Sequence, residues 1–230
     1  MIIGISQPTF LPWCGYMALI DEVDEFVFLD DVQFERRSWH QRNYIKVMDN
    51  KYLLSIPVIS KGKRFQKINE TMINYEKDLI NKIIFMLTQS YSKSPYFDKY
   101  SNDIFKIFKN NYKFISELNI NLIKFFCKIL EINTKIDFSS RLNLSSKGSD
   151  LIIDICKLKK CKKYISTIGS KSYLKQKDFV LNNIDLKFYE FEHKLYNQRG
   201  PVFLSNLSML DILLNLGPKT KQYLKENLKL

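Results

Sequence analysis

Glycine is scarce in this sequence, with 7 residues among 230, and the four cysteines stand far apart. No two cysteines form a CxxC motif, which argues against a zinc site. A GxxxxGK[ST] segment is also absent, so a Walker-type ATPase is not supported. No apolar run comes near the roughly 18 residues of a membrane span, and the first residues lack a signal-peptide pattern. We therefore expect no stable membrane insertion, a cytoplasmic location and reduced thiols.

The net charge of +12 would suit nucleic acid, an anionic membrane surface or a phosphorylated small substrate. Many of the lysines occupy scattered helical positions, however, and lysine is the ordinary residue of exposed helix surfaces. The charge alone therefore does not choose a partner. Hydrophobic residues make up 45% and charged residues 26% of the chain, close to the globular average, which argues against disorder. At this length we expect one domain, residues 1–230.

The N-terminal region predicts a β-loop-α-β unit. Residues 2–6 form a short apolar run typical of a buried strand, and Pro8 and Pro12 then impose an irregular loop because proline cannot donate to a sheet. Residues 15–23 have helical spacing, and residues 25–29 form a second buried strand. Strands joined in this way are usually parallel, with a right-handed crossover. The predicted fold class is α/β with a mainly parallel sheet.

The middle of the chain predicts helices, and its last third predicts a return to α/β alternation. Apolar stripes over about 75–135, broken at Pro95, indicate helices packed on or inserted in the α/β core. Before them, two further strands are expected at 43–47 and 52–58, with the turn at 49–50 and an exposed basic loop at 61–64. After them, we expect a helix at 150–158, strands at 163–167 and 186–191, and a final helix at 207–216 ended by Gly217 and Pro218.

The first candidate site is the turn at residues 7–16. The helix that follows points free N–H groups toward the loop, so a phosphate or carboxylate is expected to dock there. The alternative is that the prolines and tryptophan only close the end of the sheet. The strand, proline-containing loop and helix-start glycine also resemble the nucleotidyltransferase superfamily, but a tyrosine replaces its phosphate-contacting histidine, so adenylyl transfer is not implied. Candidate substrate-binding residues are Gln7, Pro8, Thr9, Trp13 and Tyr16.

The second candidate site is the polar run at residues 30–43. Its two carboxylates suit a metal ion or sugar hydroxyls, and its arginines can grip phosphate in bidentate fashion. His40 is a candidate base because its reference pKa lies near neutrality. The alternatives are that the aspartates cap the strand and pair with the arginines, and that His40 is a bystander. We assign His40 and Asp30 as catalytic candidates, and as substrate-binding candidates Asp31, Gln33, Arg36, Arg37, Arg42 and Asn43.

Two later segments carry weaker signals. Residues 164–174 place small hydroxyl residues and a glycine between a strand and a helix, which is typical of an anion cradle, although Ser170 is equally suited to cap that helix. His193 follows a predicted strand and is the remaining acid/base candidate. Ser208 and Asp211 lie three residues apart on the last helix, where capping is the alternative role of Ser208. The binding candidates here are Ser166, Gly169, Ser170, Tyr173, Tyr196, Gln198, Ser208 and Asp211.

These segments are expected to meet at one edge of the sheet. Ligands of open parallel sheets collect at the carboxyl ends of the strands, and both Gln7 and Asp30 fall there. We therefore expect a polar, phosphate-sized cleft in which the turn, the arginine-rich run and the late histidine converge.

The motifs resemble the WbqC-like family over nearly the whole chain. The closest likeness is in QPTFLPWCGY at residues 7–16, FLDDVQF at 28–34 and RSWHQRN at 37–43. Residues 164–174, 193–198 and 207–217 match later family motifs, although Lys194 replaces a usual proline and Thr167 and Ile168 interrupt a Ser-Gly pair. The family occurs mainly in O-antigen and related glycan gene clusters, so the resemblance implies a role in surface-polysaccharide assembly.

The leading hypothesis is an enzyme that transfers an acyl or aminoacyl group onto a nucleotide-activated amino sugar. His193 or His40 would act as base, and the arginines would hold the diphosphate. The donor is left open between a CoA thioester, an ATP-activated acid and a charged tRNA, with ATP-dependent ligation favoured over the others. Two alternatives remain: a non-catalytic module that binds RNA or an anionic glycan, and a glycosyltransferase whose metal is held by Asp30 and Asp31. The oligomeric state is not predicted.

Overall fold

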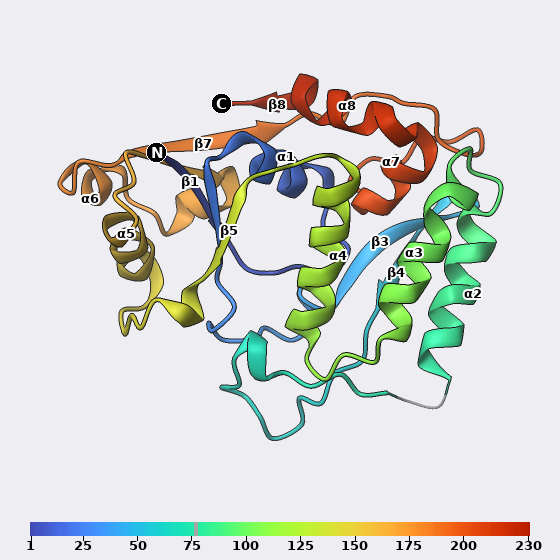
Figure 1. Cartoon of the computed structure of the whole chain (residues 1–230), viewed down its shortest axis with the longest axis horizontal. Helices are drawn as coiled ribbons and strands as arrows, with labels where there is room; N and C mark the ends of the chain where they lie inside the picture. Colours follow the sequence, from blue (N-terminus) through green and yellow to red (C-terminus); the bar gives the residue numbers. More distant parts are fainter. Residues whose placement is uncertain (76–77) are drawn as a thin grey trace.

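The computed structural model describes residues 1–75 and 78–230 and is built around a six-stranded sheet (Figure 1). The strand order is β5-β2-β1-β6-β7-β8, in which the first five strands are parallel and β8 runs antiparallel to β7. The predicted α/β class with a mainly parallel sheet is confirmed. The strands are β1 (Ile2–Ser6), β2 (Glu25–Phe28), β5 (Lys135–Phe138), β6 (Lys163–Thr167), β7 (Asp185–Phe191) and β8 (Leu228–Lys229).

β1 occupies the middle of the sheet because it is apolar on both faces. It pairs in parallel with β2 on one side and β6 on the other, so the predicted parallel pairing of the first two strands is confirmed. Gly4 is needed in this strand, since a side chain at its Cα would come within 3.0 Å of the Phe26 ring on β2. The two strands and the helix between them can therefore pack closely.

Helices cover both faces of the sheet (Figure 1). On β2, Phe26 and Phe28 join the larger apolar core under α1, α4 and α7, and Val27 joins the smaller core under α5 and α6. No helix in the described part of the chain is both long and apolar enough to cross a membrane. The helices are α1 (Cys14–Glu22), α2 (Leu79–Tyr91), α3 (Phe97–Lys109), α4 (Ile115–Ile129), α5 (Gly148–Leu158), α6 (Gln176–Val180), α7 (Met209–Leu216) and α8 (Thr220–Asn227).

Several elements differ from the sequence expectation. The strands expected at 43–47 and 52–58 are β3 (Arg42–Val47) and β4 (Asn50–Ser55), which form a separate two-stranded sheet, with the turn at residues 48–49. β4 ends before Pro57, which has no N–H to donate, and Val58 instead bridges to Ile73. β5, α6, α8 and β8 are additional elements. The predicted helical middle is confirmed as α2, α3 and α4, and the break at Pro95 falls between the first two.

The strand order reverses between β1 and β6. From β1 the chain proceeds to β2 and β5 on one side, and from β6 it proceeds to β7 and β8 on the other. The loops that leave the carboxyl ends of β1 and β6 therefore diverge and open a crevice between them. In open α/β sheets this position is where ligands bind.

Candidate functional site

A cleft of about 130 Å³ lies at this reversal. Its floor is formed by the carboxyl ends of the two central strands, and its walls come from helices on both faces of the sheet. The lining residues are Ile5, Ser6, Gln7, Tyr16, Leu19, Leu29, Ile152, Tyr164, Ser166, Thr167, Tyr173 and Tyr189. The cleft brings together members of the first and third sequence-predicted sites, namely Gln7 and Tyr16 with Ser166 and Tyr173.

A chain of hydroxyl groups runs along the β6 side of the cleft. Ser170 Oγ donates to the main-chain oxygen of Thr167 (2.6 Å), so the hydrogen between Ser166 and Ser170 (2.8 Å) belongs to Ser166. Tyr164 in turn donates to Ser166 Oγ (3.1 Å). Each of these hydroxyl hydrogens is therefore used inside the protein, and the oxygens facing the cleft can only accept. Ser170 lies in a short 3-10 helix that also contains the exposed Gly169.

Tyr189 on β7 places an unpartnered hydroxyl at the cleft. Its side chain is 2% exposed, and its oxygen has no hydrogen-bond partner among the described residues. Burial raises the pKa of this phenol, so it remains a hydrogen-bond donor at neutral pH. Buried polar groups are normally satisfied. A donor left free at the wall of a cleft is a feature that a bound ligand would explain.

Gln7 is held by His40. The Nε2 atom of His40 lies 2.8 Å from Gln7 Oε1, and its Nδ1 atom accepts from the main-chain N–H of Glu35 (3.4 Å). Because Nδ1 accepts, the ring hydrogen sits on Nε2 and points to Gln7. Burial lowers the pKa of His40 to about 4, so the ring is neutral at physiological pH. Both ring nitrogens are therefore engaged, and the contact orients the Gln7 side chain.

The turn at residues 7–13 is tied to the second predicted site. Asn43 donates to the main-chain oxygens of Phe10 (3.3 Å) and Leu11 (2.7 Å). Asn119, fully buried on α4, donates to the main-chain oxygens of Pro8 (3.1 Å) and His40 (2.8 Å). Sequence reasoning missed Asn119. Its signal is a polar residue placed within the apolar stripe of a predicted helix.

The other end of the turn contacts the late histidine. The Trp13 ring stacks on His193, with 5.7 Å between centroids, and packs edge-on against Phe191. It also covers the first turn of α1, where a side chain at Gly15 would come within 2.2 Å of the indole. Burial, followed by the charge of Lys51, lowers the pKa of His193. Its Nε2 atom has no partner among the described residues.

The Asp30 and Asp31 carboxylates join the ends of β2 and β5. Asp30, which is buried, accepts from the main-chain N–H (3.0 Å) and the hydroxyl (2.8 Å) of Ser140. Ser139 lies between the two aspartates and donates to both. No group of three or more His, Cys, Asp or Glu side chains suited to a metal ion occurs among residues 1–75 and 78–230.

The arginines of the second site lie outside the cleft. Arg36 and Arg37 are exposed, with Arg36 donating to the main-chain oxygen of Ser60 and Arg37 adopting a positive φ of 58°. Arg42 is half-buried at the start of β3, and the exposed Gln33 donates to the main-chain oxygen of Arg64 (3.1 Å). The backbone of the same segment contacts the turn, since the Trp39 carbonyl accepts from the Phe10 main-chain N–H (2.8 Å). The predicted contact of the arginines with a diphosphate stays a prediction.

The last predicted residues form a separate cluster around Asp211. Its carboxylate is 0% exposed and accepts from Tyr196 (2.6 Å) and Gln198 (3.0 Å). The Gln198 side chain also donates to the main-chain oxygen of Leu204 (2.8 Å) and accepts from the Leu204 main-chain N–H (2.8 Å), which fixes the segment over α7. Burial raises the pKa of Asp211, and the hydrogen bond from Tyr196 opposes that shift. None of the residues in this cluster lines the cleft.

Two of the predicted binding residues have a buried hydroxyl without a hydrogen-bond partner among the described residues. Ser208 precedes α7 and pairs through its backbone with Trp13, but its hydroxyl has no hydrogen bond. Thr9, in the turn, likewise has an unpartnered Oγ1 atom. Thr9 lies within the turn, and Ser208 is joined to the turn by its backbone bridge to Trp13. Their predicted role in substrate binding stays a prediction.

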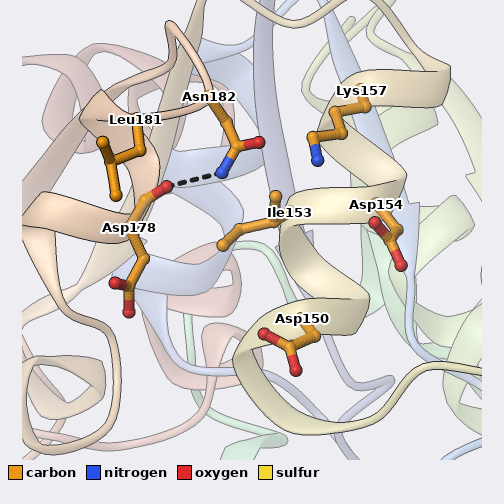
Figure 2. Close-up of a pocket in the computed structure, with 7 residues that line it drawn as sticks. All are labelled: Asp150, Ile153, Asp154, Lys157, Asp178, Leu181 and Asn182. Carbon is orange, nitrogen blue, oxygen red and sulfur yellow. Dashed lines mark hydrogen bonds between the residues drawn. The ribbon is translucent and has the colours of Figure 1, made fainter.

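Wider hollows occur elsewhere on the surface. One of about 290 Å³ lies between α5 and α6, and Figure 2 shows its lining, which includes Asp150, Asp154 and Lys157 of α5 and, across from this helix, Asp178 and Asn182. Asn182 donates to the main-chain oxygen of Asp178 (2.7 Å), the dashed line in that figure. Another, of about 370 Å³, lies between α3 and α4. Neither is located at the carboxyl ends of the strands, and neither contains a residue of the predicted sites.

Comparison with known proteins agrees with the family resemblance carried by the sequence motifs. A family model described as the WbqC-like protein family matches residues 7–223. The chain belongs to the WbqC-like family. It is 29% identical over 225 residues to a Mycobacterium tuberculosis (strain ATCC 25618 / H37Rv) protein described as "Uncharacterized protein Rv1507c", and the match covers 97% of each chain. No solved structure matches this WbqC-like chain at a significant level.

Proposed function

We propose that this WbqC-like protein acts in surface-polysaccharide assembly as a transferase or ATP-dependent ligase that adds an acyl or aminoacyl group to a nucleotide-activated amino sugar. The observation that carries the proposal is the cleft at the reversal of strand order, because α/β proteins bind nucleotides at this position. The role in surface-polysaccharide assembly comes from the WbqC-like resemblance, because that family occurs mainly in glycan gene clusters. The cleft supplies a place for the substrate.

The two histidines have different roles in this proposal. His40 uses both ring nitrogens within the protein and positions Gln7. His193 stacks on Trp13, does not line the cleft, and has a buried Nε2 atom without a partner in the described residues. Its lowered pKa leaves the ring neutral and so able to accept a proton. We therefore assign His193 as the base. The exposed arginines beside the turn would hold the diphosphate, as bidentate donors do.

Asp30 and Asp31 fit a structural role better than metal-dependent sugar transfer. Their oxygens already accept hydrogen bonds from Ser139 and Ser140, which connects the carboxyl ends of two neighbouring strands. A glycosyltransferase would need these oxygens for its metal ion. The contacts with the serines favour the acyl or aminoacyl transfer over that alternative.

The test is a thermal-shift panel of nucleotide sugars, ATP and CoA with the full chain, followed by mass spectrometry of the nucleotide sugar after incubation with an acyl or aminoacyl donor. We expect a nucleotide amino sugar to raise Tm and to gain the mass of the donated group. The His193→Ala variant should keep the Tm shift and lose the mass gain. Binding of RNA or an anionic glycan that falls steeply with salt, without any nucleotide-sugar shift, would contradict the proposal and favour the non-catalytic alternative.

A further inference from the structure

The cleft at the strand reversal has room for about one ring. Its volume of about 130 Å³ is close to that of the ~150 Å³ engineered cavity that takes up benzene, and is smaller than the ~300 Å³ at which pockets for drug-sized ligands begin. None of the residues that line it carries a formal charge. An isolated phosphate would lose its hydration there without an ionic partner. The space therefore suits a neutral ring.

Three of the seven hydroxyl groups that line the cleft already donate within the protein. Tyr16 donates to the main-chain oxygen of Gln7 (3.0 Å), and Tyr164 and Ser166 donate along the chain that ends at Thr167. A ligand cannot take these hydrogens without breaking a protein contact. The side chains can still offer oxygen lone pairs.

Other donors at the cleft remain free within the described residues, among them the hydroxyls of Ser6, Thr167 and Tyr173, and two further ones lie on Tyr189 and Gln7. The hydroxyl of Tyr189 is one, since it has no partner in the described residues. The second is the amide nitrogen of Gln7. His40 donates to Gln7 Oε1 (2.8 Å), which fixes the orientation of the amide, and no contact within the described residues uses its Nε2 atom. A ligand group that meets the Gln7 amide nitrogen must be an acceptor, and an acceptor also suits the Tyr189 hydroxyl.

We propose that the cleft binds the pyrimidine base of the nucleotide-activated sugar, with Gln7 and Tyr189 donating to its carbonyl oxygens. This inference rests on the proposed function and identifies the part of the substrate that enters the cleft. A uracil-type base is a neutral six-membered ring with two carbonyl acceptors. The diphosphate then lies outside the cleft, and His40 is a positioning residue that sets the direction of the Gln7 amide.

The test is calorimetric titration of the full chain with uridine, UDP, adenosine and N-acetylglucosamine. Tyr189→Phe removes the free donor and leaves no protein group unpaired, so the fold is kept. The matched control is Tyr223→Phe, whose hydroxyl donates to the Lys194 carbonyl (2.6 Å) away from the cleft. We expect uridine to bind and its Kd to rise about 5- to 10-fold in Tyr189→Phe, the effect of one lost hydrogen bond, with little change in the control.

A second variant addresses the amide. Gln7→Glu keeps an oxygen that accepts from His40 but has no donor, so uridine binding should fall while UDP retains whatever the diphosphate contributes. Uridine affinity should change little between low and high salt, because no charged group faces the ring, whereas UDP affinity should fall with salt.

The outcomes separate this inference from the proposed function. Nucleotide-sugar binding that neither variant changes would overturn the inference and leave the proposed function standing. Binding of N-acetylglucosamine in place of uridine, sensitive to Tyr189→Phe, would put the sugar in the cleft and also overturn it. Uridine binding without any nucleotide-sugar stabilisation would support the base site and contradict the proposed function.

Discussion

The cleft and the Asp211 cluster are both rich in polar side chains, but they satisfy them in opposite ways. Around Asp211, the hydroxyl of Tyr196 and the amide of Gln198 donate within the protein, and the carboxylate is wholly buried, with only its Oδ1 atom unpartnered among the described residues. At the cleft, Gln7 and Tyr189 keep donors that no described residue uses. Polar residues from similar-looking motifs are therefore divided between holding a loop in place and lining the cleft with donors that the protein does not use.

This difference provides a criterion for reading the WbqC-like motifs. A polar side chain whose hydrogen bonds are made within the protein stabilises the fold, and its loss is measured as stability. A side chain with an unmatched donor beside a cavity is available for a ligand, and its loss is measured as affinity. Substitutions in the two regions should therefore separate the two measurements.

The largest effect is expected at Asp211. Replacing it with alanine leaves the Tyr196 hydroxyl and one hydrogen of Gln198 without their acceptor in a buried site, which should cost about 3–5 kcal/mol of unfolding free energy. Urea unfolding measures this loss. Asp211→Asn, which keeps an acceptor oxygen, should lose less. If Asp211→Ala instead left stability unchanged and abolished ligand binding, the distinction between the two regions would fail.

Acidification should destabilise the protein through His40. The pKa of His40 is about 4 when folded, below the ~6.5 of an exposed histidine, so the unfolded chain takes up the proton first as pH falls. The stability that the neutral ring contributes is complete above pH ~6.5 and is lost progressively toward pH ~4, by about 3 kcal/mol in total. The free energy of unfolding, measured with urea at several pH values, checks this loss. His193, with its lowered pKa, acts in the same direction, so its variant is measured alongside.

The comparison that isolates His40 is with His40→Asn. This variant should be less stable at neutral pH and should show a flatter pH dependence between the two pKa values. If the unfolding free energy of the wild type and of His40→Asn depended on pH in the same way, the pKa of His40 would not be lowered as its burial predicts.

A smaller effect is expected at Gly15. An added methyl group would come within 2.2 Å of the Trp13 ring and must displace it, at a cost of about 1–3 kcal/mol. Gly169→Ala is the matched control, since the nearest atom to its methyl group would be Thr167 Oγ1 at 3.8 Å. Tryptophan fluorescence and thermal unfolding measure both. Equal Tm values for the two variants would argue against the tight contact.

The smallest change in stability is expected at Arg37. Its positive φ of 58° is a conformation that glycine adopts freely, so Arg37→Gly should change stability by about 1 kcal/mol or less. If the arginines hold the diphosphate, the same variant should weaken UDP binding and leave uridine binding unchanged. An equal loss for both ligands would assign Arg37 to the cleft instead.

Much of the fold could be predicted because the strongest signals are local. The apolar run at residues 2–6, the two prolines and the helical spacing that follows predict a parallel unit, and the Gly217 and Pro218 pair marks the end of α7. The elements that were missed lack such signals. β5 is a four-residue strand directly after a long helical stretch, β8 has two residues, and α8 is polar on most of its surface.

The candidate site was predicted less completely, since its geometry depends on pairing between distant segments. The turn, the RSWHQRN run and residues 164–174 could be chosen from their composition. The Asn119 contact with the turn and the free hydroxyl of Tyr189 depend on which strands and helices become neighbours. Whether His40 acts as a base or a positioning group likewise depends on what its second nitrogen contacts.

The central position of β1 has a consequence for how the chain is made. Its pairing with β2 becomes possible as soon as residue 28 has left the ribosome, but its other partner, β6, begins only at Lys163. Throughout the intervening synthesis, one backbone edge of an apolar strand stays unmatched, and such edges promote aggregation. Nascent chains of the WbqC-like protein that are released before β6 is complete should therefore be a target for chaperones.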